Sequence, residues 1–159
     1  MMKKQTWKNY AFWIILSELT GAISGWLSRD GMEIFKAAVK KPPLSPPSAA
    51  FPIVWGILYL LMGIAAARIS LLDNSGKRNR ALLVFLAQLA MNFLWSLIFF
   101  NAQAFAFAFV WLLLLLLLAS LTAVRFYRLD STAGILLLPY ILWLVFAAYL
   151  NLGVWYLNI

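Results

Sequence analysis

Charged residues divide this chain into long apolar stretches. No charged side chain occurs from Ala81 to Val124. As one helix this stretch would be about 66 Å long, roughly twice the thickness of a bilayer's hydrocarbon core. It therefore predicts two membrane-spanning helices, joined by a very short turn at the polar residues Asn101 to Gln103. The gaps between the other charged residues predict three further spans.

We therefore predict an all-α protein, a single polytopic transmembrane domain built as a bundle of five helices. The spans are expected at about residues 10–28, 48–72, 81–100, 104–124 and 132–156, within one domain over residues 1–159. The long connection 29–47 is expected to lie outside the membrane. Its four prolines, between Pro42 and Pro47, predict a stiff, extended strap. This strap either covers the mouth of a cavity or only ends one helix and starts the next.

Composition supports a membrane protein and excludes several kinds of chemistry. Hydrophobic residues make up 65% of the chain and charged residues 11%, too few to cover a soluble domain of this size. The chain has no Cys and no His. It therefore has no disulfide, no thiolate or imidazole haem ligand, no His or Cys zinc site and no His or Cys catalytic residue. We expect no required cofactor, no metal site and no catalytic residues.

The net charge of +8 orients the bundle. The basic residues lie in the short segments between spans, where anionic lipid headgroups are found, so we expect no nucleic-acid partner. Nine of the 13 fall on the side that holds the N-terminus: Lys3, Lys4, Lys8, Arg68, Lys77, Arg78, Arg80, Arg125 and Arg128. In a bacterial plasma membrane this distribution predicts a cytoplasmic N-terminus.

Polar and aromatic side chains recur at helical spacing in three of the predicted spans. Because unpaired carboxamides are costly in lipid, these stripes are expected to face protein or a cavity. The alternative interpretation is ordinary packing between helices, with the carboxamides bonded across it. The stripes are Trp55, Tyr59 and Met62 in the second span, Gln88, Asn92, Trp95 and Phe99 in the third, and Tyr140, Trp143, Ala147 and Leu150 in the fifth.

The chain resembles the translocator protein family, also called tryptophan-rich sensory proteins or peripheral benzodiazepine receptors, over nearly its whole length. The resemblance implies a five-helix bundle, often a homodimer, with a cavity that binds tetrapyrroles such as protoporphyrin IX. Many members also bind isoquinoline carboxamides and sterols. The matching motifs are Lys41-Pro42, Pro46-Pro47, Trp55 to Tyr59, Met62-Gly63, Gln88 to Asn92, Trp95, Phe99-Phe100, Pro139-Tyr140, Trp143, Phe146-Ala147 and Leu150-Asn151.

The resemblance also assigns expected site residues. Those expected to bind a flat aromatic ligand are Trp55, Tyr59, Gln88, Asn92, Trp95, Phe99, Tyr140, Trp143, Phe146, Ala147 and Leu150. Those expected in a loop or lid over the cavity are Phe35, Lys36, Lys41, Pro42, Pro46 and Pro47. A tetrapyrrole would stack on the tryptophans, and we hypothesise that its propionates meet Lys36, Lys40 or Lys41.

The lid, the fourth span and the C-terminal region each depart from the family pattern. Phe35-Lys36 stands where the family has Trp-Tyr, Leu44 stands where it has Trp between the prolines, and Trp111 aligns with a frequent Asp. The altered lid predicts a changed ligand preference. No basic residue follows Arg128, so the family's sterol-recognition pattern is incomplete and we do not expect sterol binding.

Glu18 lies inside the first span and is not explained by the resemblance. One interpretation makes it the proton-exchanging group of a proton-coupled exporter of aromatic cations. The other makes it a residue that is hydrogen-bonded at a helix interface beside Ser17 and Thr20. Nearby Gly21 and Gly25 form a GxxxG motif, which predicts close helix contact within the bundle or in a dimer.

From these observations we expect a protein that binds, senses, transports or disposes of porphyrin-like ligands rather than an enzyme. No acid and base pair and no metal-ligand set requires catalysis. Light-dependent breakdown of a bound porphyrin stays open, and substitution of Trp55 or Trp143 by Phe would test it.

Overall fold

The computed structural model describes residues 2–159, with side chains described from Thr6 onward. Lys3 and Lys4, which entered the charge count, lie outside the described side chains. Within the described residues, five helical spans are long and apolar enough to cross a membrane, which confirms the predicted fold class. The helices are α1 (Met2–Ala38), α2 (Ala50–Ser70), α3 (Gly76–Ser96), the π-helix η1 (Leu97–Asn101), α4 (Phe105–Leu129), α5 (Ser131–Ile135) and α6 (Leu138–Leu157).

The first helix is longer than the predicted first span. Residues 29–38 were expected in a loop, but they continue α1 without a break. This extension packs against η1: the backbone of Gly31 lies so close to Phe100 that a side chain at Gly31 would clash with it. The Asn101 side-chain amide also donates to the Leu27 carbonyl oxygen at 2.9 Å. The strap is therefore shorter than predicted and comprises residues 39–49.

The fifth span is broken near one end. Asp130 caps α5, because its Oδ1 accepts from the Thr132 backbone N–H at 2.9 Å. The helix is interrupted between Ile135 and Leu138, just before Pro139. Proline has no N–H to donate to a preceding turn and its ring crowds that turn, so a continuous helix is disfavoured here.

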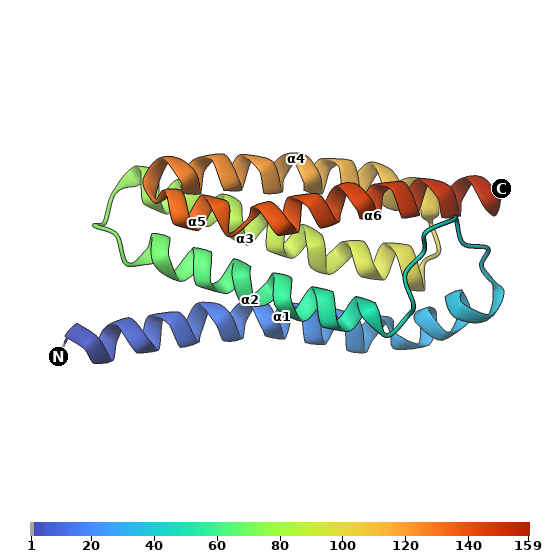
Figure 1. Ribbon diagram of the computed structural model, residues 1–159, viewed down its shortest axis with the longest axis horizontal. Helices are drawn as coiled ribbons and strands as arrows, with labels where there is room; N and C mark the ends of the chain where they lie inside the picture. Colours follow the sequence, from blue (N-terminus) through green and yellow to red (C-terminus); the bar gives the residue numbers. More distant parts are fainter. Residues whose placement is uncertain (1) are drawn as a thin grey trace.

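The helices form a ring in the order α1, α2, α6, α4, α3 and back to α1. Figure 1 shows α1 and α2 along one side of the bundle, α4 to α6 along the other, and α3 between them. We call the end that holds the N-terminus, Arg68 and Asp130 the basic end, and the opposite end the strap end. Toward the basic end α2 is tightly packed, and Met62, Ala65, Ala66 and Ile69 are fully buried.

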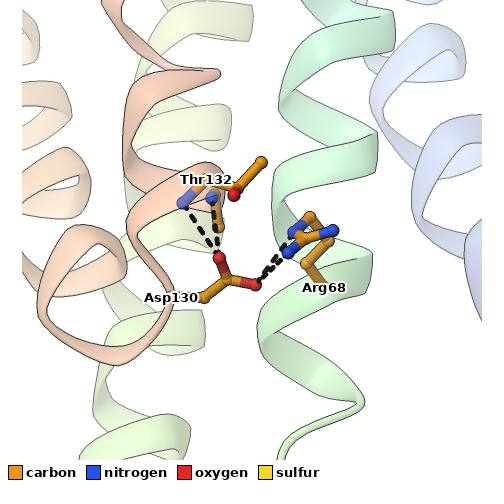
Figure 2. A network of polar contacts seen from close by, with 4 residues as sticks. Arg68, Asp130 and Thr132 are labelled. Atoms are coloured by element: carbon orange, nitrogen blue, oxygen red, sulfur yellow. Dashed lines mark hydrogen bonds and ion pairs between the residues drawn. The ribbon is translucent and has the colours of Figure 1, made fainter.

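An ion pair joins two elements at the basic end. Asp130 Oδ2 lies 2.8 Å from both Nε and Nη2 of Arg68, which stands in the last turn of α2. The other oxygen of Asp130 caps α5, so one carboxylate serves both contacts (Figure 2). The pair holds the end of α2 against the start of the fifth span.

The strap is fastened to α6 at the other end. It runs from the end of α1 to the C-terminal end of α6 and back to the start of α2 (Figure 1). The Lys40 backbone N–H donates to Asn158 Oδ1 at 3.0 Å, and Asn158 Nδ2 donates to the Lys40 carbonyl at 2.9 Å. The Tyr149 hydroxyl donates to the Pro43 carbonyl at 2.9 Å. These bonds tie α6 to the α1–α2 hairpin.

Candidate functional site

A chain of hydrogen bonds crosses the middle of the bundle. Tyr59 of α2 donates to Asn92 Oδ1 at 3.2 Å, and Asn92 Nδ2 donates to the Tyr140 hydroxyl oxygen at 2.9 Å. Tyr140 of α6 in turn donates to Gln88 Oε1 at 2.8 Å. All four side chains are buried. We call Tyr59, Gln88, Asn92 and Tyr140 the polar network; it joins α2, α3 and α6.

The polar network leaves several of its N–H groups without a strong acceptor. Gln88 Nε2 donates only to the Met62 sulfur at 3.8 Å, and a thioether is a weak acceptor. A carboxamide carries two N–H groups, so Gln88 and Asn92 each keep one without a hydrogen-bond partner among the described residues. The network can therefore offer N–H groups to a ligand that presents a carbonyl, carboxylate or ring nitrogen.

Aromatic rings cover the network on the side of α2 and α6. Trp55 lies 5.5 Å from the Tyr59 ring and 6.3 Å from the Tyr140 ring, measured between centroids. Its ring centroid is 6.5 Å from that of Trp143, and the two planes are perpendicular at 88°. A groove of about 430 Å³ runs beside Trp143 between the two helices. Its lining residues are Val54, Ile57, Leu58, Pro139, Leu142, Trp143 and Phe146.

A second aromatic cluster lies nearer the strap end. Trp95 stacks on Phe99 at 5.1 Å, and Phe35 of α1 packs against Phe99 at 5.3 Å. Trp95 Nε1 donates to Asn151 Oδ1 at 3.3 Å, and Asn151 Nδ2 donates to the Phe105 carbonyl at 2.8 Å. These contacts fasten α3, α4 and α6 together below the strap.

The structure divides the predicted ligand-binding residues into these two groups. Trp55 and Trp143 lie with the polar network, whereas Trp95 and Phe99 belong to the second cluster. Phe146 lines the groove, Ala147 is buried and Leu150 is half-buried. Instead of lining an open cavity, the network side chains bond to one another and fill the interior. The hollow beside them is the groove between α2 and α6.

The predicted lid residues are also divided. Pro42 is buried against Gly153 of α6, Pro46 is half-buried and Pro47 is exposed. Phe35 and Lys36 lie on α1 rather than in the strap. The Lys36 ammonium pairs with Glu33 at 2.7 Å, and the Lys41 ammonium lies 5.6 Å from the centre of the Phe35 ring. Fewer of these residues belong to the strap than predicted, because α1 is longer.

Sequence reasoning named two residues, Asn151 and Trp111, without assigning them a role in holding the site. Asn151 links Trp95 to Phe105, and its spacing of eight from Trp143 places it on the same helix face, which is the signal that could have found it. Trp111, which aligns with an Asp of the family, donates its indole N–H to the Met91 carbonyl at 2.9 Å. No pattern in the sequence indicated this bond from α4 to α3.

Comparison with known proteins agrees with this architecture. A model of the TspO/MBR family matches residues 13–157. Protein CrtK of Rhodobacter capsulatus is 40% identical over 122 residues, covering 76% of each chain. A tryptophan-rich sensory protein of Cereibacter sphaeroides is 38% identical over 120 residues, covering 76% of this chain and 74% of its own. The translocator protein of Sus scrofa is 38% identical over 121 residues, covering 75% and 72%. The chain therefore belongs to the TspO/MBR family, and is an integral membrane protein of receptor-like or transporter-like type.

Proposed function

We propose that this protein binds flat aromatic ligands of the porphyrin type between α2 and α6, above the polar network. The proposal rests on the perpendicular pair Trp55 and Trp143. These two rings lie between the buried polar network and the apolar groove. A tetrapyrrole has a large π-face for an indole and ring nitrogens for N–H donors. The groove opens on the outside of the bundle, so such a ligand would come from the lipid or past the strap.

Binding next to the network requires α2 and α6 to move apart. At the basic end, Arg68 and Asp130 tie α2 to the start of the fifth span, and at the strap end Asn158 and Tyr149 tie α6 to the strap. Movement is easiest between these ties, where few residues of α2 and α6 contact each other. The spare N–H groups of Gln88 and Asn92 would then hold an acceptor atom of the ligand. The exposed Lys40 side chain is available to a propionate at the mouth.

The test is a titration with protoporphyrin IX of the purified protein in nanodiscs, followed by quenching of tryptophan fluorescence. We expect saturable binding that weakens at least tenfold in Trp143→Ala. Trp26→Ala is the matched control, because Trp26 is exposed on α1, away from the groove. Wild-type affinity in Trp143→Ala, or no saturable binding by the folded wild type, would reject the proposal.

We further propose that the basic end faces the cytoplasm of a bacterial plasma membrane. The excess of Lys and Arg at this end supports the orientation. A homodimer remains a prediction from the family resemblance. Single cysteines at Asp73 and Leu44, in a chain that has no Cys of its own, would report the orientation by labelling from one side only.

A further inference from the structure

Several basic side chains at the basic end have no partner that neutralises them. Arg68 is paired with Asp130, and the Arg78 guanidinium donates to the carbonyl oxygens of Ser70 and Leu72. The other basic side chains described at this end have no hydrogen bond or ion pair with any residue from Thr6 onward. They are Lys8, Lys77, Arg80, Arg125 and Arg128. All of them except Lys8 lie on α3 and α4.

Arg80 and Arg125 flank the line of contact between α3 and α4, which we call the α3–α4 seam. The Trp111 indole N–H donates across this seam to the Met91 carbonyl at 2.9 Å. Eleven residues make about three helical turns and fourteen about four. Arg80 therefore lies on the same side of α3 as Met91, and Arg125 on the same side of α4 as Trp111. By the helical rise they lie about 16 Å and 21 Å from this bond, both toward the basic end. The two arginines are thus at similar depth on either side of the seam.

Aromatic packing holds these helix ends together. The rings of Phe85 and Phe126 stack across the seam at 5.7 Å, and both side chains are fully buried. Lys77 precedes Arg80 by about one turn, and Arg128 follows Arg125 by about one turn, so both extend the charge toward the helix ends. We call Lys77, Arg80, Arg125 and Arg128 the α3–α4 basic cluster.

The basic cluster borders on an apolar surface. Arg80 and Arg125 stand directly at the two ends of the uncharged stretch from Ala81 to Val124, at the level where lipid headgroups lie. Leu83, about one turn from Arg80, is 67% exposed, and Leu121, about one turn from Arg125, is 39% exposed. Cations at headgroup level above lipid-facing leucines match a molecule that has a phosphate at one end and acyl chains at the other.

We propose that the α3–α4 basic cluster binds an anionic phospholipid, whose phosphate is held by Arg80 and Arg125 and whose acyl chains lie along α3 and α4. Charge complementarity favours this occupant, because a guanidinium can hold a phosphate through two parallel N–H groups. The acidic residues of the basic end do not compete with the lipid. Asp130 is paired with Arg68, and Asp73 lies in the connection between α2 and α3.

The four charges of the cluster favour a lipid that carries two phosphates, such as cardiolipin. A free phosphate or a soluble headgroup would leave the neighbouring leucines uncovered, so the acyl chains are part of what is recognised. The cluster lies on α3 and α4, whereas the proposed porphyrin site lies between α2 and α6, and neither proposal depends on the other.

The test is native mass spectrometry of the whole protein in detergent, titrated with cardiolipin and with phosphatidylcholine of the same acyl chains. We expect one tightly bound cardiolipin and much weaker binding of phosphatidylcholine. Arg80→Gln and Arg125→Gln should each lower the cardiolipin affinity at least threefold, and the double variant at least tenfold. Lys8→Gln is the matched control, because it removes an unpaired charge from the same end but lies on α1, which α3 separates from α4 in the ring.

Deacylated cardiolipin, the soluble headgroup with both phosphates, separates a lipid site from a phosphate site. We expect no competition with intact cardiolipin at equal concentration, because the headgroup gains nothing from the apolar surface. Circular dichroism checks that each variant is folded. Wild-type cardiolipin affinity in the folded double variant, or an equal loss in Lys8→Gln, would overturn the proposal. So would equally tight binding of phosphatidylcholine, or effective competition by the deacylated headgroup.

Discussion

At the scale of single residues, Tyr140 is the centre of the polar network. It accepts from Asn92 and donates to Gln88, whereas Tyr59 makes one bond of this network, to Asn92. Polar groups in the bilayer core must be satisfied within the protein. The mutual bonds of these four side chains explain how an apolar bundle accommodates two carboxamides and two phenols near its centre.

The two tyrosines should therefore differ in their contribution to stability. Hydrogen bonds between membrane helices are worth about 0.6 kcal/mol on average and up to about 1.7 kcal/mol. Tyr140→Phe removes two bonds, so we expect it to lower the free energy of unfolding by about 1–3 kcal/mol, and Tyr59→Phe by about half as much. Unfolding in SDS, followed by circular dichroism, measures both losses. Equal losses would contradict the central position of Tyr140.

The sequence predicted which residues lie on this face, but not how they meet. The spacing of Gln88 and Asn92 correctly indicated that they face protein, because lipid cannot satisfy a carboxamide. Spacing does not reveal where a side chain ends. Tyr59 and Tyr140 extend across the interior and fill it. Whether they can do so depends on the distances between the helices, and the residue spacing within one helix does not give those distances.

At the scale of helices, glycines control how closely α1 and α2 approach. The backbone of α1 passes so near Gly63 that a methyl group there would lie 2.9 Å from the Trp13 carbonyl oxygen, whereas a methyl group at Gly56 would lie in open space. The two positions are on the same face of α2, two turns apart. They form a matched pair within one helix.

Gly63→Ala and Gly56→Ala should therefore have different effects. We expect Gly63→Ala to cost about 1–3 kcal/mol, because overpacking forces α1 and α2 apart. Gly56→Ala should be neutral or stabilising by up to about 1 kcal/mol, since alanine favours the helix. Thermal unfolding in detergent distinguishes them. A neutral Gly63→Ala would mean that the helices are not in close contact at this point.

The position of charged residues did not predict correctly where α1 ends. Charged residues between Arg29 and Lys36 indicated a loop, yet α1 continues to Ala38. Its extension is stabilised by contacts with η1, far away in the sequence, through Gly31 and Asn101. The five spans depend only on apolar length, so they could be predicted. The end of α1 depends on tertiary contact and could not.

At the scale of the whole molecule, two fastenings hold opposite ends of the bundle. Arg68 and Asp130 fasten α2 to the fifth span at the basic end (Figure 2). At the other end Asn158 and Tyr149 fasten the strap to α6. The groove between α2 and α6 lies between them, so freeing the strap should loosen the strap end alone.

Proteolysis of the strap tests this arrangement. Asn158→Ala removes both bonds to Lys40, and Tyr149→Phe removes the bond to Pro43. We expect trypsin to cleave after Lys40 severalfold faster in each variant. Tyr156→Phe is the matched control, because Tyr156 is 76% exposed and away from the strap contacts. Cleavage at the wild-type rate in both variants would show that these bonds do not hold the strap.

The contact between Lys40 and Asn158 also has a consequence for biosynthesis. The two residues are 118 positions apart, and the second follows α6. The ribosome synthesises the strap long before it synthesises Asn158. The strap therefore stays undocked until the fifth span has entered the membrane. Protection of Lys40 from protease should therefore be the last event of maturation, and its onset would time the completion of the bundle.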